Sequence, residues 1–296
     1  MYKINKAAVI GAGTMGLGIA GQLANAGVPV VLLDMPSAGD NRNAICERAL
    51  ERLLDVRQPG LLHKDFVERI TIGNIEDDLD KIADADWIAE AVVERLDIKR
   101  SLYKDIDAIR KVGSIVSSNT STIPISLLVD DMPAAFRREF AITHFFNPVR
   151  YMRLLELVTG PETLLEIVEF LADFGRFRLG KGIVFGKDTP NFVGNRIGVY
   201  GIVSTLKHMM EMDYQVDEVD AITGPAMGHF GYNAGAPASV RTILTSVWGA
   251  SWFAGTAGEW DGNSVGACPG FDELLLLDKV AGNVHVVRFD RYANAG

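Results

Sequence analysis

A histidine and a glutamate in the middle of this chain could form an acid–base pair. His144 lies in the run Thr143–Pro148, which reads THFFNP, and Glu156 lies in the apolar run Leu154–Val158. A buried carboxylate is costly unless it is paired, and a histidine beside it gains basicity. Histidine titrates near neutral pH, so it suits removal of a hydroxyl proton without a metal. We predict that His144 is a general base oriented by Glu156; the alternative is a histidine that only fills an aromatic core.

A glycine motif near the start of the chain has the spacing of a dinucleotide-binding turn. Residues 11–16 read GAGTMG, and they separate an apolar run from a helical pattern. Gly11 allows a tight turn, Gly13 lets the backbone approach a pyrophosphate, and Gly16 lets helix and strand pack closely. The start of the helix adds unpaired N–H groups for the anion. The motif residues predicted to bind the cofactor are Gly11, Gly13, Thr14, Met15 and Gly16.

Asp34 identifies the dinucleotide that this motif favours. It ends the next apolar run, about 20 residues after the motif, where a carboxylate accepts hydrogen bonds from the adenosine ribose. The carboxylate would repel a 2′-phosphate, and the following residues, Met35 and Pro36, offer no cation. We therefore predict NAD rather than NADP. The motif alone leaves FAD open, and a structural aspartate beside a glycine-rich turn is the alternative.

A sheet is needed to bring these side chains to one edge, and the first half of the chain has the pattern for it. Short apolar runs alternate with helical patterns, which is typical of a parallel sheet covered on both faces. The expected strands are Ala7–Ile10, Val28–Leu33, Trp87–Val92, Ser114–Ser117 and Phe140–Thr143. The predicted fold class is α/β, a Rossmann-type doubly wound parallel sheet followed by a partial, mainly helical second domain.

The pattern changes twice along the chain, and we predict three regions from it. Residues 1–187 form the NAD-binding domain, 188–228 begin a helical substrate or dimerisation domain, and 229–296 are an atypical tail. Pro190 is expected to open a long helix that runs to Met212, because proline is tolerated at a first helical position. Earlier helices are expected at Thr14–Ala26, Asn41–Gln58 and Pro161–Phe174.

Composition excludes several classes of function. The chain has 296 residues, 48% of them hydrophobic, and a formal net charge of −9, which disfavours nucleic acid as a partner. We expect no membrane span, no metal site and a cytoplasmic location, and Cys46 and Cys268 as structural thiols. An anionic substrate would need a local basic patch. The candidates are Arg42, Arg48, Arg52 and Lys64, whose alternative is an ordinary solvated helix face.

Together these motifs resemble the L-3-hydroxyacyl-CoA dehydrogenases of fatty-acid β-oxidation, over about residues 6–228. The resemblance rests on several short runs and single residues. They are the GAGTMG turn, Glu94–Lys99, Ser118–Ser121, His144–Pro148, Glu156, and Lys187–Pro190 leading to Asn195-Arg196. After Gly228 the chain departs from the family pattern, which continues with further helices. We interpret this departure as a changed reading frame, an alternative terminus or the end of a fragment.

The resemblance implies oxidation of a 3-hydroxyacyl-CoA to a 3-ketoacyl-CoA, with NAD as hydride acceptor and an acyl-CoA as substrate. It implies that His144 is the base, that Glu156 orients it, and that Ser121 and Asn195 bind the reacting oxygens of the substrate. The residues implied around the nicotinamide half of NAD are Glu94, Lys99, Ser121 and Asn147. A homodimer also follows from the resemblance, with its contact in the second domain.

Structural alternatives exist for four of these residues. Ser121 could be a helix cap before Pro124, and Asn195 a surface amide of a helix. Glu94 and Lys99 could be solvated residues at the start of a helix.

Two other functions compete for the whole chain. One is a dehydrogenase of another small hydroxy acid, in which Lys187 or Lys207 would be the base. The other is a non-catalytic or truncated family member that only binds NAD. Neither lysine explains why His144 and Glu156 occur together. The presence of Ser121, His144, Glu156 and Asn195 indicates an active ancestor, which leaves the second alternative open.

Overall fold

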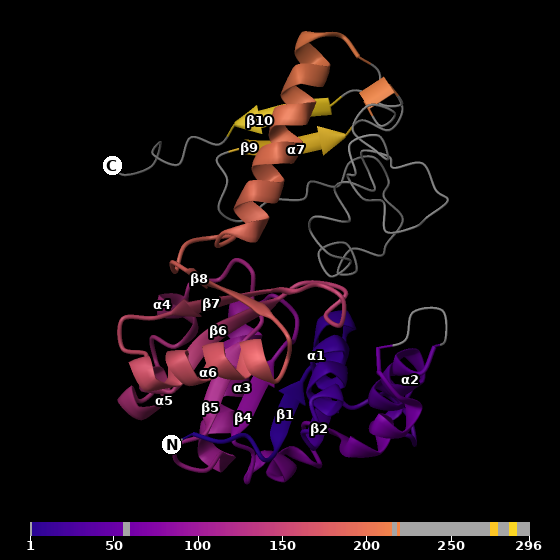
Figure 1. The fold of residues 1–296 in the computed structure, drawn as a ribbon, viewed down its shortest axis with the longest axis vertical. Helices are drawn as coiled ribbons and strands as arrows, with labels where there is room; N and C mark the ends of the chain where they lie inside the picture. The colour runs from indigo at the N-terminus through magenta and orange to yellow at the C-terminus, as the bar shows by residue number, and fades with distance from the viewer. Residues whose placement is uncertain (1, 56–59, 215–217, 220–272, 278–283, 289–296) are drawn as a thin grey trace. The chain divides into compact units, whose positions relative to one another are not determined.

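The computed structural model describes residues 2–55, 60–214, 218–219, 273–277 and 284–288 (Figure 1). The chain divides into two compact units, Met1–Phe192 and Val193–Gly296. The first unit contains an eight-stranded sheet, and the second contains one long helix and a strand pair within its described residues.

The sheet of the first unit has the strand order β3-β2-β1-β4-β5-β6-β7-β8. Its strands are β1 (Ala7–Ile10), β2 (Val30–Asp34), β3 (Ile70–Asn74), β4 (Trp87–Glu90), β5 (Ile115–Ser118), β6 (Phe140–Phe145), β7 (Leu154–Thr159) and β8 (Gly182–Gly186). Every pair from β3 to β6 is parallel, β7 is antiparallel to β6, and β8 is parallel to β7. The predicted Rossmann-type α/β fold is confirmed. The sequence interpretation missed β3 and ended the predicted β6 two residues too early, before His144 and Phe145.

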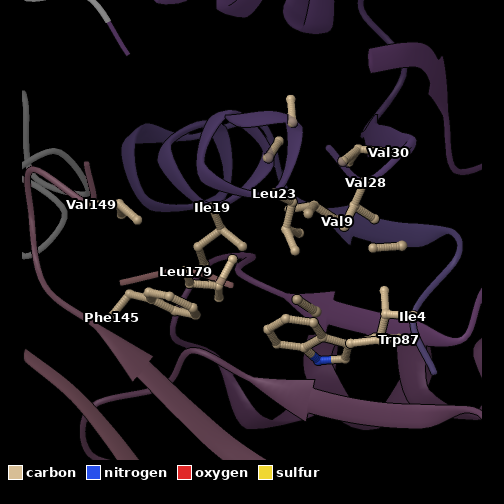
Figure 2. Close-up of a cluster of buried hydrophobic side chains, with 14 of the residues drawn as sticks. Ile4, Val9, Ile19, Leu23, Val28, Val30, Trp87, Phe145, Val149 and Leu179 are labelled. Carbon is tan, nitrogen blue, oxygen red and sulfur yellow. The ribbon is translucent and has the colours of Figure 1, made fainter. Parts of the chain in front are cut away.

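Helices cover both faces of this sheet, as a doubly wound fold requires. They are α1 (Thr14–Asn25), α2 (Ala44–Leu53), α3 (Leu96–Ile109), α4 (Ile125–Leu128), α5 (Ala134–Arg138) and α6 (Leu165–Phe177), with 3-10 turns at Lys64–Arg69 and Leu79–Ile82. The apolar sides of α1, α2 and α6 pack on one face, and those of α3, α4 and α5 pack on the other. Figure 2 shows the first of these cores, in which Ile19 and Leu23 of α1 approach Trp87 and Phe145 of the sheet.

The first helix has a clear physical beginning and end. It begins directly after Gly13 and ends at Asn25, with Gly27 two residues beyond at a φ of 82°. This left-handed conformation is accessible to glycine without a steric penalty, so Gly27 turns the chain from α1 into β2. Ile19, Ala20, Leu23 and Ala24 are buried. The helix is therefore fixed on the sheet with its N-terminus at the glycine motif.

The second unit contains α7 (Gly194–Glu211) and the antiparallel pair β9 (Glu273–Leu277) and β10 (Val284–Arg288). The helix expected from Pro190 to Met212 begins four residues later, at Gly194. Asn191 and Phe192 have φ values of 63° and 44°, which a right-handed helix does not allow. Most of the atypical tail, residues 229–296, lies outside the described residues. No helix of the described part of the chain is long and apolar enough to cross a membrane.

Candidate active site

His144 and Glu156 face each other across two neighbouring strands. They are partners in the antiparallel register of β6 and β7. The Nδ1 atom of His144 lies 2.8 Å from a carboxylate oxygen of Glu156. His144 is 5% exposed and Glu156 is fully buried. Because an ionised carboxylate only accepts hydrogen bonds, Nδ1 carries the proton and Nε2 is left as the basic nitrogen.

Two phenylalanine rings flank the imidazole of His144. The ring of Phe146 lies 4.5 Å from it between centroids, and the ring of Phe192 lies 5.6 Å away in an edge contact at 63°. Phe192 is buried. The sequence pattern gave no signal for Phe192. The histidine therefore combines an apolar surround, which was the basis of the core alternative, with a buried carboxylate partner.

At two glycines of the glycine turn a Cβ atom would collide with the chain, and at the third it would meet open space. A Cβ atom on Gly11 would lie 2.5 Å from the Ala91 carbonyl oxygen, and one on Gly16 would lie 1.7 Å from the Gly11 carbonyl oxygen. A Cβ atom on Gly13 would meet nothing within 4 Å. The first turn of α1 carries no acidic residue that would offset the positive potential of its N–H groups. These groups face the open space beside Gly13. These residues fit the pyrophosphate of a dinucleotide.

Asp34 lies at the carboxyl end of β2, beside this turn. One of its carboxylate oxygens accepts a hydrogen bond from the backbone N–H of Ala12, inside the glycine motif. The other accepts from the N–H of Met35 at 2.6 Å. The carboxylate therefore holds the turn and presents a negative charge at the edge where a ribose would bind.

Arg42 and Arg52 differ in the partners that their guanidinium groups contact. The guanidinium of Arg42 pairs with Glu76 and Asp77, each at 2.6 Å, so its charge is locally offset. Arg52 reaches across from α2 and donates a hydrogen bond of 3.2 Å to the hydroxyl of Thr14. Of these two members of the predicted basic patch, only Arg52 contacts the glycine motif.

Glu94 organises the loop that carries Ser121. Its carboxylate accepts hydrogen bonds from the hydroxyl of Thr120, from the N–H of Ser121 at 3.2 Å, and from the hydroxyl of Thr122 at 3.0 Å. Burial acts to raise the pKa of Glu94, but Lys99 and the two threonine hydroxyls outweigh it and lower that pKa. Glu94 is therefore an anion that fixes the backbone around Ser121.

Lys99 is buried in α3 between two glutamates. Its ammonium group lies 2.6 Å from a carboxylate oxygen of Glu90 and 3.3 Å from one of Glu94. Glu90, fully buried at the end of β4, also accepts hydrogen bonds of 2.7 Å from the hydroxyls of Tyr103 and Ser118. The alternative of a solvated helix start is wrong for Lys99. Sequence reasoning missed Glu90, although a carboxylate inside an apolar run is the same signal that identified Glu156.

Ser121, Asn147 and Asn195 occupy different settings. Ser121 is half-buried in the loop after β5, and Asn147 is exposed in the loop after β6. Ser121 does not cap α4, because the N–H of Ile125 is bound by the carboxylate of Asp188 at 3.0 Å. Asn195 is half-buried in the first turn of α7, in the second unit. The structure thus brings Ser121 together with Glu94, and the predicted roles of all three residues stay predictions.

Lys181 is a buried cation that the sequence interpretation did not single out. Its ammonium group donates hydrogen bonds to the carbonyl oxygens of Val149 and Met152, in the loop that follows Asn147. Burial lowers the pKa of Lys181 to about 8. The Val149 side chain fills the space beside Gly18 of α1, where a Cβ atom would lie 2.7 Å from it. Lys181 therefore ties the loop after His144 to the helix that starts at the glycine motif.

Cys46, the cysteine within the described residues, is a buried thiol whose pKa burial raises to about 11. Its Sγ atom lies 3.3 Å from the carbonyl oxygen of Gly73. This agrees with the predicted structural role. Cys268 lies outside the described residues.

A doubly wound sheet with a glycine turn, an acidic residue at the end of β2 and a buried histidine–glutamate pair defines the class of NAD-binding dehydrogenase domains. Residues 6–189 match the family described as 3-hydroxyacyl-CoA dehydrogenase, NAD binding domain. The chain belongs to the 3-hydroxyacyl-CoA dehydrogenase family. The predicted resemblance and the choice of NAD are confirmed.

Two bacterial relatives show how much of a longer protein this chain corresponds to. A probable 3-hydroxyacyl-CoA dehydrogenase of Deinococcus radiodurans is 46% identical over 228 residues, which are 76% of this chain and 66% of the relative. Another probable 3-hydroxyacyl-CoA dehydrogenase, from Bacillus subtilis, is 44% identical over 244 residues, 77% of this chain and 31% of the relative. The chain spans less than two thirds of the length of both proteins.

Solved structures show the same fold. The (S)-3-hydroxybutyryl-CoA dehydrogenase of Ralstonia eutropha is 30% identical, with a TM-score of 0.64, over 77% of this chain and 79% of that one. FadB2 of M. tuberculosis is also 30% identical, with a TM-score of 0.63, over 76% of this chain and 79% of that one. Both matches cover most of each chain.

The glycine turn makes a paired prediction about folding and binding. Gly16→Ala should lower the free energy of unfolding by about 3 kcal/mol or more, because the new Cβ atom would collide with rigid backbone. Gly13→Ala should change it by less than about 0.5 kcal/mol, since Gly13 has a φ of −65° and open space around it. Gly13→Ala should also weaken NADH binding about tenfold, because the new Cβ atom would block the approach of the pyrophosphate. Denaturation and NADH fluorescence titration measure both; equal loss of stability in the two variants would contradict this.

Lys181 predicts a pH dependence of stability. Its pKa of about 8 in the folded protein lies below the ordinary value of 10.5. The unfolded chain therefore binds more protons between these values, so the contribution of Lys181 to the free energy of unfolding rises with pH across this window. The rise should total about 3 kcal/mol, and it should be lost in Lys181→Met. Denaturation from pH 7 to about 10.5 measures it, with Lys3→Met, an exposed lysine, as control. A constant difference between wild type and Lys181→Met over this range would refute it.

Proposed function

We propose that this chain oxidises (S)-3-hydroxyacyl-CoA to 3-ketoacyl-CoA with NAD. The observation that carries the proposal is the buried His144–Glu156 pair at 2.8 Å, on the same sheet as the glycine turn. The ends of β1 and β6 lie at one edge of the sheet, because these strands are linked through parallel pairs. Family membership supports the choice of substrate. Both named relatives are described as probable 3-hydroxyacyl-CoA dehydrogenases.

In this proposal each residue has a separate task. NAD, when bound, supplies the hydride acceptor. His144 takes the proton of the 3-hydroxyl on Nε2, while Glu156 accepts a hydrogen bond from the Nδ1–H group and stabilises the imidazolium that forms. Ser121 and Asn195 donate hydrogen bonds to the reacting oxygens of the substrate. Glu94, held by Lys99, fixes the loop that carries Ser121 and borders the nicotinamide half of NAD.

The remaining binding residues divide between the two halves of the cofactor. Gly11, Gly13 and Gly16 with Thr14 and Met15 would hold the pyrophosphate, and Asp34 would bind the adenosine ribose. Asn147 would face the nicotinamide, on the loop that Lys181 supports. Arg52, beside Thr14, is the basic residue nearest to the anionic part of this site. A homodimer remains an expectation from the family resemblance.

The proposal is tested by NADH oxidation with acetoacetyl-CoA. His144→Ala should lower kcat by about 10² or more, since it removes the general base of the oxidation, which donates the proton in the reverse reaction that this assay measures. NADH binding should stay within about twofold, because neither His144 nor Glu156 is among the residues proposed to hold the cofactor. His63→Ala is the matched control, because the side chain of His63 is 59% exposed and its polar contacts are with Asp65, at 3.4 Å and 3.5 Å.

Two results would contradict the proposal. Full activity in His144→Ala would remove His144 as the base. A folded wild-type chain that binds NADH but never turns over the thioester would instead indicate a family member that only binds the cofactor.

A further inference from the structure

The segment between β8 and α7 contacts two of the residues to which the proposed function assigns chemistry, Ser121 and His144. The N–H of Asn191 donates a hydrogen bond of 3.1 Å to the carbonyl oxygen of Ser121. The ring of Phe192 contacts the imidazole of His144 at 5.6 Å. Asp188, in the same segment, accepts from the N–H of Ile125 at 3.0 Å. Three contacts, through Asp188, Asn191 and Phe192, thus fix this segment within the first unit.

The backbone of this segment adopts a conformation that neither residue prefers. Asn191 and Phe192 have φ values of 63° and 44°, and they are 4% and 3% exposed. Asparagine tolerates the left-handed region, whereas a bulky aromatic residue rarely enters it. Such strain persists only where surrounding contacts fix it, and it is concentrated at functional sites. The strain here is retained at the two residues that contact Ser121 and His144.

Phe192 lies close against the sheet because β8 has a glycine opposite it. A Cβ atom on Gly186 would lie 3.6 Å from the Cβ of Phe192 and 3.0 Å from a methyl group of Val158. Phe192 belongs to the same core cluster as Val158, whose strand also carries Glu156. The phenyl ring of Phe192 therefore lies at the border between this apolar core and the His144–Glu156 pair.

An apolar wall at this place has a chemical consequence. A hydrogen bond to a carboxylate is stronger and longer-lived where water cannot compete for either partner. A general base must also keep its ring orientation, since misplacement by an ångström can cost about 10² in rate. The edge contact with Phe192 restricts rotation of the imidazole. The hydrogen bond from the N–H of Asn191 holds the loop of Ser121 in a fixed position relative to it.

We propose that Asn191 and Phe192 form a positioning element that keeps water from the His144–Glu156 pair and fixes Ser121 relative to His144. The proposal rests on the proposed function for its catalytic meaning. Its structural part, the protection of the pair, does not depend on any substrate.

The direct test is exchange of the His144 Nδ1 proton with water, measured by NMR on the full chain without cofactor. The signal is assigned by its loss in His144→Ala. In Phe192→Leu the exchange rate should rise about tenfold or more, because a smaller apolar side chain opens the wall. Phe174→Leu is the control: Phe174 is also buried, but it packs against Trp87 in the other core. It should cost similar stability and leave the exchange rate unchanged.

Kinetics separate positioning from folding. Phe192→Leu should lower kcat with acetoacetyl-CoA about tenfold and leave the KM for NADH within about twofold, whereas Phe174→Leu should change neither. Unchanged exchange and unchanged kcat in Phe192→Leu would overturn the proposal. If the wild type shows no turnover, the proposed function fails, and the exchange measurement still decides whether Phe192 protects the pair.

A second pair of variants tests the left-handed backbone. Asn191→Gly keeps the N–H and allows a positive φ, so both the protected proton and kcat should be retained. Asn191→Val keeps the N–H, but a β-branched residue resists this conformation, so proton exchange should accelerate about tenfold and kcat should fall by a similar factor. Wild-type exchange and kcat in Asn191→Val would show that the backbone conformation has no such role.

Discussion

Glu90 and Glu156 are both fully buried in the central sheet, where a carboxylate is tolerated only if hydrogen bonds or a partner charge replace its hydration. For Glu156 the partner is His144, which the antiparallel turn of the chain from β6 into β7 places directly opposite. For Glu90 it is Lys99, which also reaches Glu94. Satisfying two buried carboxylates therefore fixes the base on one strand pair and the loop of Ser121 on another.

The candidate site residues that the sequence identifies most clearly share a strong local signal. The GxGxxG spacing between an apolar run and a helical pattern identifies Gly11, Gly13 and Gly16, because few other structures need glycine at all three positions. Glu156 stands out because a charge interrupts an apolar strand, and its pairing with His144 follows from the cost of burial. The alternation of apolar runs and helices predicted the sheet and the edge at which these residues meet.

The residues that the sequence did not reveal depend on contacts between distant segments. Lys181 binds the loop at Val149 and Met152, some thirty positions away, and a lysine between two glycines carries no pattern that predicts this. Phe192 follows a proline that reads as the start of a helix, and only the folded chain shows that its φ is 44°. The strand β3, Ile70–Asn74, contains Gly73 and alternates poorly, which concealed it from a search for apolar runs.

The short segment before α7 also bears on where this protein can be divided. The match to the family's NAD-binding domain ends at residue 189, whereas the first compact unit continues to Phe192. A fragment cut at the end of that domain match would lose Asn191 and Phe192, and with them one wall of the core beside His144. The limit of the domain match and the limit of the compact unit thus differ by a few residues. Those residues determine whether an isolated domain excludes water from His144.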